Sequence, residues 1–167
     1  QLRRGVVHRD YAVLGHGWLP PKRTEVCARL HKTGDSGSPS AVVPWGRPSR
    51  TQLRATAHAT LCLPKTDVDR GFALSLIVVR IGTGRKHQIR GHLGHIGYPV
   101  VCDGQYTERE TFENDTSWCR RNFLHRHHLT FQDSAGEMRD VSAPLPSDLL
   151  NVLRRLRPRT PCSAEAP

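Results

Sequence analysis

The residues best equipped for chemistry lie in one segment, GRKHQIRGHLGHIGYPVVCDGQY, which runs from Gly84 to Tyr106. Its first half places arginine, lysine, histidine and glutamine at steps of three and four residues, so they share neighbouring faces of a helix. No Asp or Glu occurs between Gly82 and Val101, whereas a merely solvated helix face ordinarily mixes both signs of charge. The segment therefore predicts a site for an anionic ligand.

Histidines also bind metal ions, so a metal centre is the first alternative. His92 and His95 are three residues apart, and the HRHH run at 125–128 adds three more imidazoles. Zinc sites usually combine closer pairs with a thiolate or carboxylate, as in HExxH or CxxC, and the sequence has neither. Because the neighbouring Arg and Lys side chains would repel a dication, we expect no metal.

The composition points to a polyanionic partner. The 167 residues hold 25 Lys+Arg against 15 Asp+Glu, a formal net charge of +10, which favours binding to nucleic acid. The length is sufficient for one domain with a buried core, and without a run of 18 apolar residues we expect no membrane span. Five cysteines without a CxxC pair argue against a disulfide framework and favour an intracellular, reducing compartment, with cytoplasm, nucleus and organelle all open.

The first half of the chain has the pattern of strands. Residues 5–17 mix β-branched and aromatic residues and end in glycine, which is typical of a strand. Prolines and glycines break up residues 18–50, which we expect to be extended with short strand pieces. Residues 51–63 and 71–81 predict two further strands, paired antiparallel across a short loop.

The second half adds short helices. Apolar residues at helical spacing predict a helix over 85–95 with Thr83 as its N-cap. Residues 107–122 are polar and are expected to form a loop, whereas 123–133 return to strand alternation. A last helix is predicted within 146–156. Together these elements predict an α+β domain with a mixed, mostly antiparallel sheet and a few short helices.

The basic segment closely resembles the signature of the RluA-type RNA pseudouridine synthases, GRxHQhRxHhxxhGxPhxGDxxY, where h is apolar. Cys102 departs from this pattern, which has glycine there. RDYAVLGHG resembles the family's KxYxAxVxG strand and places Tyr11 on its tyrosine, and the resemblance extends from about residue 6 to 150. The positions that match the signature are Gly84, Arg85, His87, Gln88, Arg90, His92, Gly97, Pro99, Asp103 and Tyr106.

The resemblance implies a pseudouridine-synthase-like fold and the conversion of uridine to pseudouridine in structured RNA, either ribosomal or transfer RNA. It implies no metal, nucleotide or redox cofactor. Arg90 would pair with a catalytic aspartate, and Tyr11 would pack against the target base. The expected substrate-binding residues are Arg85, Lys86, His87, Gln88 and His92.

The family's catalytic aspartate comes from an HRLDxxTSG motif, which these 167 residues do not contain. The HRD at 8–10 lacks the apolar residue and directly precedes Tyr11, so Asp10 is not expected to replace it. We therefore expect residues 1–156 to form a partial catalytic domain that is inactive alone, followed by a disordered tail at 157–167. A non-catalytic RNA-binding protein with the same fold is the alternative, and the sequence predicts no oligomeric state.

Overall fold

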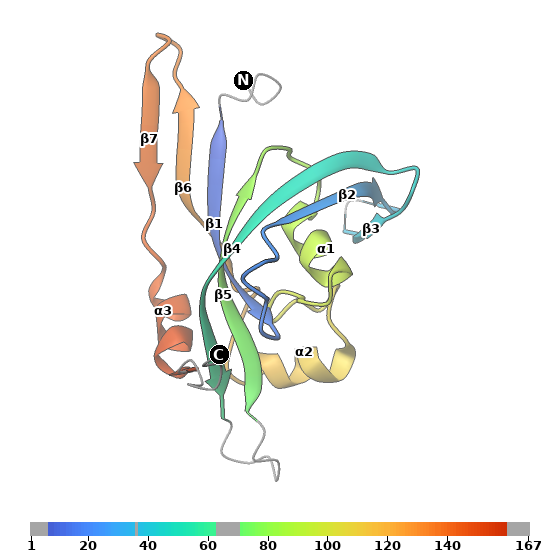
Figure 1. The fold of residues 1–167 in the computed structure, drawn as a ribbon, viewed down its shortest axis with the longest axis vertical. Coiled ribbons are helices and arrows are strands. Elements are labelled where there is room, and N and C mark those ends of the chain that lie inside the picture. The colour runs from blue at the N-terminus through green and yellow to red at the C-terminus, as the bar shows by residue number, and fades with distance from the viewer. Residues whose placement is uncertain (1–6, 36, 63–70, 160–167) are drawn as a thin grey trace, which may run out of the picture.

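A computed structural model describes residues 7–35, 37–62 and 71–159. They form one twisted sheet with the strand order β3-β2-β4-β5-β1-β6-β7, and β8 pairs with β4 (Figure 1). Every pairing in this sheet is antiparallel, which agrees with the mostly antiparallel sheet that the sequence predicted. The strands are β1 (His8–His16), β2 (Glu25–Lys32), β3 (Ser40–Val42), β4 (Arg47–Leu61), β5 (Phe72–Ile81), β6 (Leu124–Gln132), β7 (Met138–Ser142) and β8 (Arg157–Pro158).

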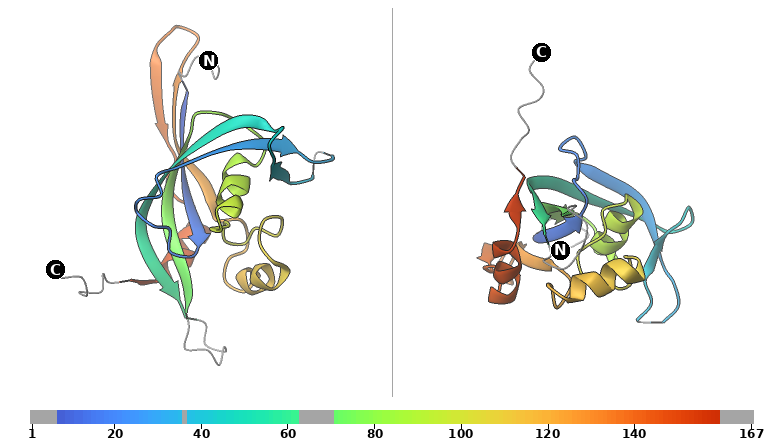
Figure 2. Two further views of the ribbon diagram at one scale, coloured as in Figure 1. Left: turned by 45° about the vertical axis from the view of Figure 1, so that its right-hand side comes forward. Right: turned by 90° about the horizontal axis from the view of Figure 1, so that it is seen from below.

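Three helices cover the sheet: α1 (Gln88–His95), α2 (Arg109–Thr116) and α3 (Ser147–Arg154). α1 and α2 lie on one side of the sheet and α3 lies on the other (Figures 1 and 2). No helix in the described part of the chain is long and apolar enough to cross a membrane.

Strand alternation divides the core into two clusters. Ile77 and Val79 of β5 are fully buried and belong to the same cluster as Ile89 and Leu93 of α1. Leu74 belongs to a second cluster that includes Leu149 and Val152 of α3. The first cluster fixes α1 against the sheet, and with it the basic signature segment.

The helix of the signature begins later than predicted. It starts at Gln88, because the preceding His87 has a left-handed backbone with φ 51°. Thr83 does not cap the backbone; its hydroxyl donates instead to the Gln88 side chain at 2.8 Å. At the other end Gly97 has φ 83°, and the Tyr98 amide donates to the Leu93 carbonyl at 2.9 Å, a Schellman-type ending.

The loop predicted for residues 107–122 is wrong, because Arg109–Thr116 form α2. α2 is held in place by contacts with residues that precede it in the sequence. The Phe112 ring lies over Gly104, where a Cβ would be 3.1 Å from the ring. Asp115 is buried and accepts hydrogen bonds from the His16 ring and the Cys102 amide at 2.8 and 2.7 Å. A polar, weakly periodic sequence gives little sign of a helix held in this way.

The chain stays ordered slightly beyond the expected boundary of the tail. Arg157 and Pro158 form β8 on β4, and the Arg159 amide donates to the His58 carbonyl at 2.9 Å. The prediction of disorder from residue 157 is therefore wrong for these three residues. The remainder of the predicted tail, residues 160–167, lies outside the described residues.

Candidate functional site

Arg90 is the best anchored cation of the signature segment. Its Nε and Nη2 donate to the two carboxylate oxygens of Asp103 at 2.6 and 2.5 Å. The Asp103 side chain is 0% exposed and that of Arg90 is 16% exposed. This ion pair raises the pKa of Arg90, which stays charged. Arg90 was expected to await a carboxylate, and the structure supplies one from the signature itself.

The ion pair with Asp103 orients the Arg90 guanidinium through Nε and Nη2 and leaves Nη1 outside the pair. Nη2 also donates to the Gln105 side chain at 3.2 Å, and the Arg90 group lies 5.0 Å from the centre of the Tyr106 ring. Within the described residues, no hydrogen bond leaves from Nη1. Because the two-point contact with Asp103 fixes the guanidinium plane, Nη1 points in one defined direction and can meet a second acceptor.

Tyr11 lies on the same side of the sheet as α1. It is half-buried and packs against the cluster that contains Ile89 and Leu93. It pairs with Val79 on one flank and with Arg126 on the other, next to a register shift in β1. No hydrogen bond joins Tyr11 to Arg90 within the described chain; the two residues share the α1 side of the sheet.

Asp10 contacts Arg80 and His128 rather than Arg90. Its carboxylate accepts two hydrogen bonds from Arg80 at 2.6 and 2.7 Å and lies 3.1 Å from the His128 ring. The Arg80 contacts are the main cause of the lowered pKa of Asp10. Arg80 and Val79 are neighbours on β5, so they point to opposite faces, and Val79 faces α1. The structure therefore places Asp10 on the opposite face of the sheet from Tyr11.

Two of the residues predicted to bind substrate are buried instead. The Gln88 side chain donates to the Arg50 carbonyl at 2.9 Å and to the Thr51 hydroxyl at 3.1 Å. His92 is 0% exposed, and its Nε2 lies 3.0 Å from the Ser49 hydroxyl. Burial lowers the pKa of His92 to about 4, so its ring is neutral at neutral pH. Both side chains fasten α1 to β4.

His87 links α1 to the end of the signature. Its Nδ1 lies 3.3 Å from the Tyr106 hydroxyl, and the two rings meet edge to face. The same hydroxyl accepts from the Ser40 amide at 2.6 Å and donates to the Ser40 carbonyl at 3.1 Å. Burial, together with the charges of Arg90 and Lys86, lowers the pKa of His87. A left-handed backbone in a residue with a side chain is a local strain of the kind found at functional sites.

Two further arginines have buried nitrogens without a partner among the described residues. These are Nε of Arg85, and Nε and Nη2 of Arg9. The Arg9 guanidinium lies against Gly84, where a Cβ would meet its Nη1 at 3.1 Å. Sequence reasoning missed Arg9, although it occupies the first position of the strand pattern that includes Tyr11. Buried donors without acceptors are costly, so these nitrogens favour an acceptor from a bound ligand or water.

Comparisons with known proteins give relatives that cover most of the chain. No family model matches the chain. An uncharacterized RNA pseudouridine synthase of Chloroflexus aurantiacus is 36% identical over 141 residues, which are 84% of this chain and 40% of that protein. The ribosomal large subunit pseudouridine synthase C of Haemophilus ducreyi is 31% identical over 162 residues, 94% of this chain and 47% of that protein.

Solved structures give the same fold. Human RNA pseudouridylate synthase domain containing 1 has a TM-score of 0.74 at 23% identity, over 97% of this chain and 64% of that one. A second human protein, RNA pseudouridylate synthase domain containing 4, has a TM-score of 0.66 at 18% identity, over 96% of this chain and 66% of that one. The fold is therefore that of a pseudouridylate synthase domain, as the sequence predicted.

The signature residues and these relatives together make the chain similar to the RluA-type RNA pseudouridine synthases. It spans about half the length of the curated relatives that it matches.

Proposed function

We propose that this chain supplies the arginine and tyrosine side of an RNA pseudouridine synthase active site. The observation that supports this most is Arg90, whose guanidinium is fixed by the buried Asp103 while Nη1 remains open to a second acceptor. A guanidinium held in this way is suited to position a catalytic carboxylate. Tyr11, on the same side of the sheet, is proposed to pack against the target base.

The proposed reaction is an isomerisation in which atoms balance without a cofactor. The bond from N1 of uracil to C1′ breaks, the base turns, and a bond from C5 to C1′ forms. The proton on C5 is lost and N1 gains one. A carboxylate has to start this sequence, and a nearby arginine keeps such a group ionised.

The described aspartates of the signature, of α2 and of β1 do not fit the role of that carboxylate. Asp103 and Asp115 are buried, and Asp10 lies on the opposite face from Tyr11. We propose that a segment outside these 167 residues supplies the aspartate, which would meet Nη1 of Arg90. The orphan nitrogens of Arg9 and Arg85 would add positive charge nearby.

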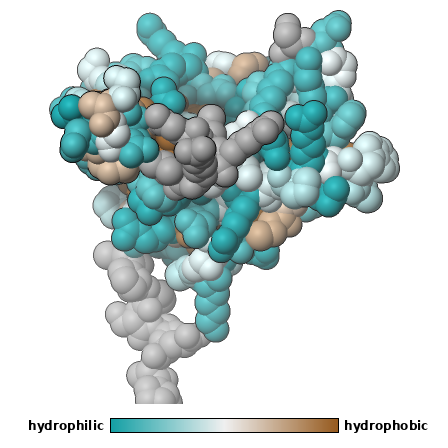
Figure 3. Space-filling view, turned by 90° about the horizontal axis from the view of Figure 1, so that it is seen from above, coloured by the Kyte–Doolittle hydropathy of each residue, from teal (hydrophilic) through white to brown (hydrophobic). Residues whose placement is uncertain are grey.

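The proposed partner is structured RNA, ribosomal or transfer RNA. The net charge of +10 supports a polyanion. The face of the molecule in Figure 3 is mostly hydrophilic, with apolar residues in small separate patches, as suits a charged partner. The Haemophilus ducreyi relative is named for the large ribosomal subunit. Access to the base requires that the uridine leave its stack.

A non-catalytic RNA-binding protein is the second candidate, and the buried state of Asp103 and Asp115 favours it. The test uses the 167-residue chain with RNA that carries tritium on C5 of uridine, and follows tritium release alongside RNA binding. We expect binding without release. Release by the chain alone would contradict the proposal that the aspartate lies outside it, and failure to bind RNA would contradict both candidates.

A further inference from the structure

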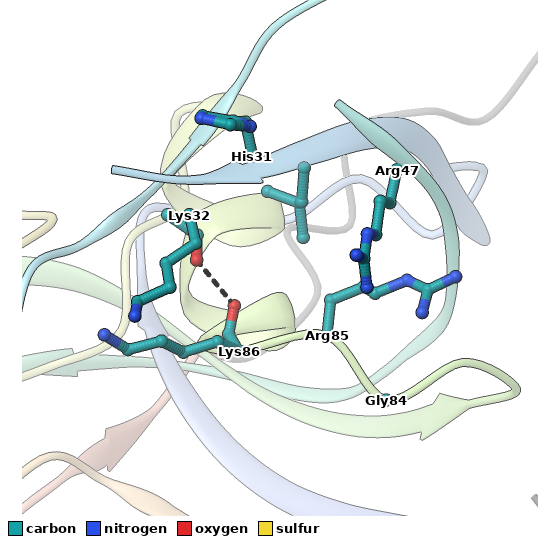
Figure 4. Close-up of a pocket in the computed structure, with 8 residues that line it drawn as sticks. His31, Lys32, Arg47, Gly84, Arg85 and Lys86 are labelled. Atoms are coloured by element: carbon teal, nitrogen blue, oxygen red, sulfur yellow. Dashed lines mark hydrogen bonds between the residues drawn. The ribbon is translucent and has the colours of Figure 1, made fainter. Parts of the chain in front are cut away.

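A second basic feature lies beside α1, in a hollow of about 340 Å³ between the β2–β3 hairpin and the loop that enters the helix (Figure 4). Its size is within the range of small-molecule pockets, about 300–1,000 Å³. The buried Leu30 lies in its wall, and the Ser40 hydroxyl donates to the Lys86 carbonyl at 2.8 Å, which ties the hairpin to the loop. The hollow is therefore a built feature with fixed walls. Its lining residues are Leu30, His31, Lys32, Ser40, Arg47, Gly84, Arg85 and Lys86.

The lining of this hollow is one-sided in charge. Four cations and one imidazole line it, and no carboxylate does. Arg47 and Arg85 lie on one side, and Lys32 and Lys86 lie on the other (Figure 4). Like charges gathered in this way repel one another, so an anion that neutralises them would relieve the repulsion.

The individual cations differ in how they are held. Lys86 donates to the Ser38 carbonyl at 2.8 Å, which keeps its charge at the rim. Nε of Arg85 is buried with no partner among the described residues. Lys32 and Arg47 are exposed, and no ion pair of theirs is present in the described chain. An anion in the hollow would therefore find both anchored and adaptable donors.

We propose that this hollow is a subsite for a backbone phosphate of the RNA, distinct from the Arg90–Asp103 pair. Arginine and lysine are the residues that bind phosphate, arginine through its fork and lysine as a point charge. The hollow adjoins α1, so a strand that presents its uridine to Tyr11 would pass close by. This inference rests on the proposed function for the identity of the polyanion. His31, Lys32 and Arg47 thereby gain a role that the signature does not give them.

The test compares two double variants of the 167-residue chain that remove the same charge. K32A/R47A removes the two adaptable cations of the hollow. R109A/R154A removes two exposed arginines from α2 and α3 and serves as the matched control. Anisotropy of a labelled stem–loop RNA gives the affinity at several salt concentrations, and circular dichroism verifies that each variant is folded.

We expect K32A/R47A to lower the RNA affinity at least about tenfold, as for loss of charged hydrogen bonds. The slope of log affinity against log salt should fall by about 0.7–0.9, the value for one phosphate. The control should change both much less. Equal losses of RNA affinity in the two variants would overturn the subsite. A K32A/R47A variant that loses binding to polyglutamate but keeps its RNA affinity would also overturn it, and would indicate an acidic protein partner. Pseudouridine formation is read separately, in a synthase that contains this chain together with the missing aspartate. Its failure there would refute the proposed function while the phosphate subsite still stood.

Discussion

Replacement of Arg90 by methionine tests the central contact of the site. Methionine keeps much of the volume of the arginine side chain but removes both hydrogen bonds to Asp103. The Asp103 carboxylate would then be a buried charge without an ion-pair partner, because its side chain is 0% exposed and only the Gln105 amide would still donate to it. Loss of one partner of a buried pair costs about 3–5 kcal/mol. We expect the free energy of unfolding of R90M to fall by about that amount.

The assay is urea unfolding followed by circular dichroism, with R121M as the matched control. Arg121 makes a similar ion pair with Asp148, but the two side chains are 43% and 47% exposed. Exposed pairs contribute about 0–1 kcal/mol, so R121M should lose little. The double variant R90M/D103L, which removes both charges, should recover a substantial part of the loss of R90M. Equal losses of unfolding free energy for R90M and R121M would refute the argument that the Arg90–Asp103 ion pair is stronger because it is buried.

Three further predictions follow from the site. The pKa of His92 is lowered from 6.5 to about 4, so between these values the unfolded chain binds more protons than the folded one. The free energy of unfolding should therefore fall by up to about 3 kcal/mol as the pH drops from 6.5 to 4, and H92N should show a shallower fall in urea titrations. G94A should raise the melting temperature, since an added methyl group meets Tyr106 no closer than 3.4 Å and helix propensity gains up to about 1 kcal/mol. G91A should gain less, because its methyl group would meet the Ser40 carbonyl at 3.4 Å and Leu30 at 3.3 Å; a larger gain for G91A than for G94A would contradict this packing. In a synthase that contains this chain, Y11F should keep more tritium release than Y11A, since the proposed role uses the ring; equal activities would exclude that role.

Much of the sheet could be predicted from the sequence, because strand alternation and turn residues are local signals. β1 and β5 lie within the predicted ranges, and β4 and β5 form the expected antiparallel pair. Gly97 ends α1 with the positive φ that glycine tolerates best. The start of α1 was not predictable, because no local pattern shows that His87 adopts a left-handed backbone and contacts Tyr106, 19 residues away.

The site was predictable in outline but not in its contacts. The partner of Arg90 is Asp103, and no local pattern shows that two residues 13 apart will form a buried ion pair. The resemblance to the signature assigned Gln88 and His92 to substrate binding, and tertiary packing buries both side chains. Cys102 has φ 59°, which explains in physical terms why the family pattern has glycine there.

The most direct test of the proposed function supplies the aspartate. In the Haemophilus ducreyi synthase, this chain replaces the part that it matches, and release of tritium from C5 of uridine in RNA is measured. The account predicts release when the aspartate of the donor segment is present and none when it is changed to asparagine. A folded, RNA-binding chimera that carries the aspartate yet releases no tritium would contradict the account and leave a non-catalytic RNA-binding protein.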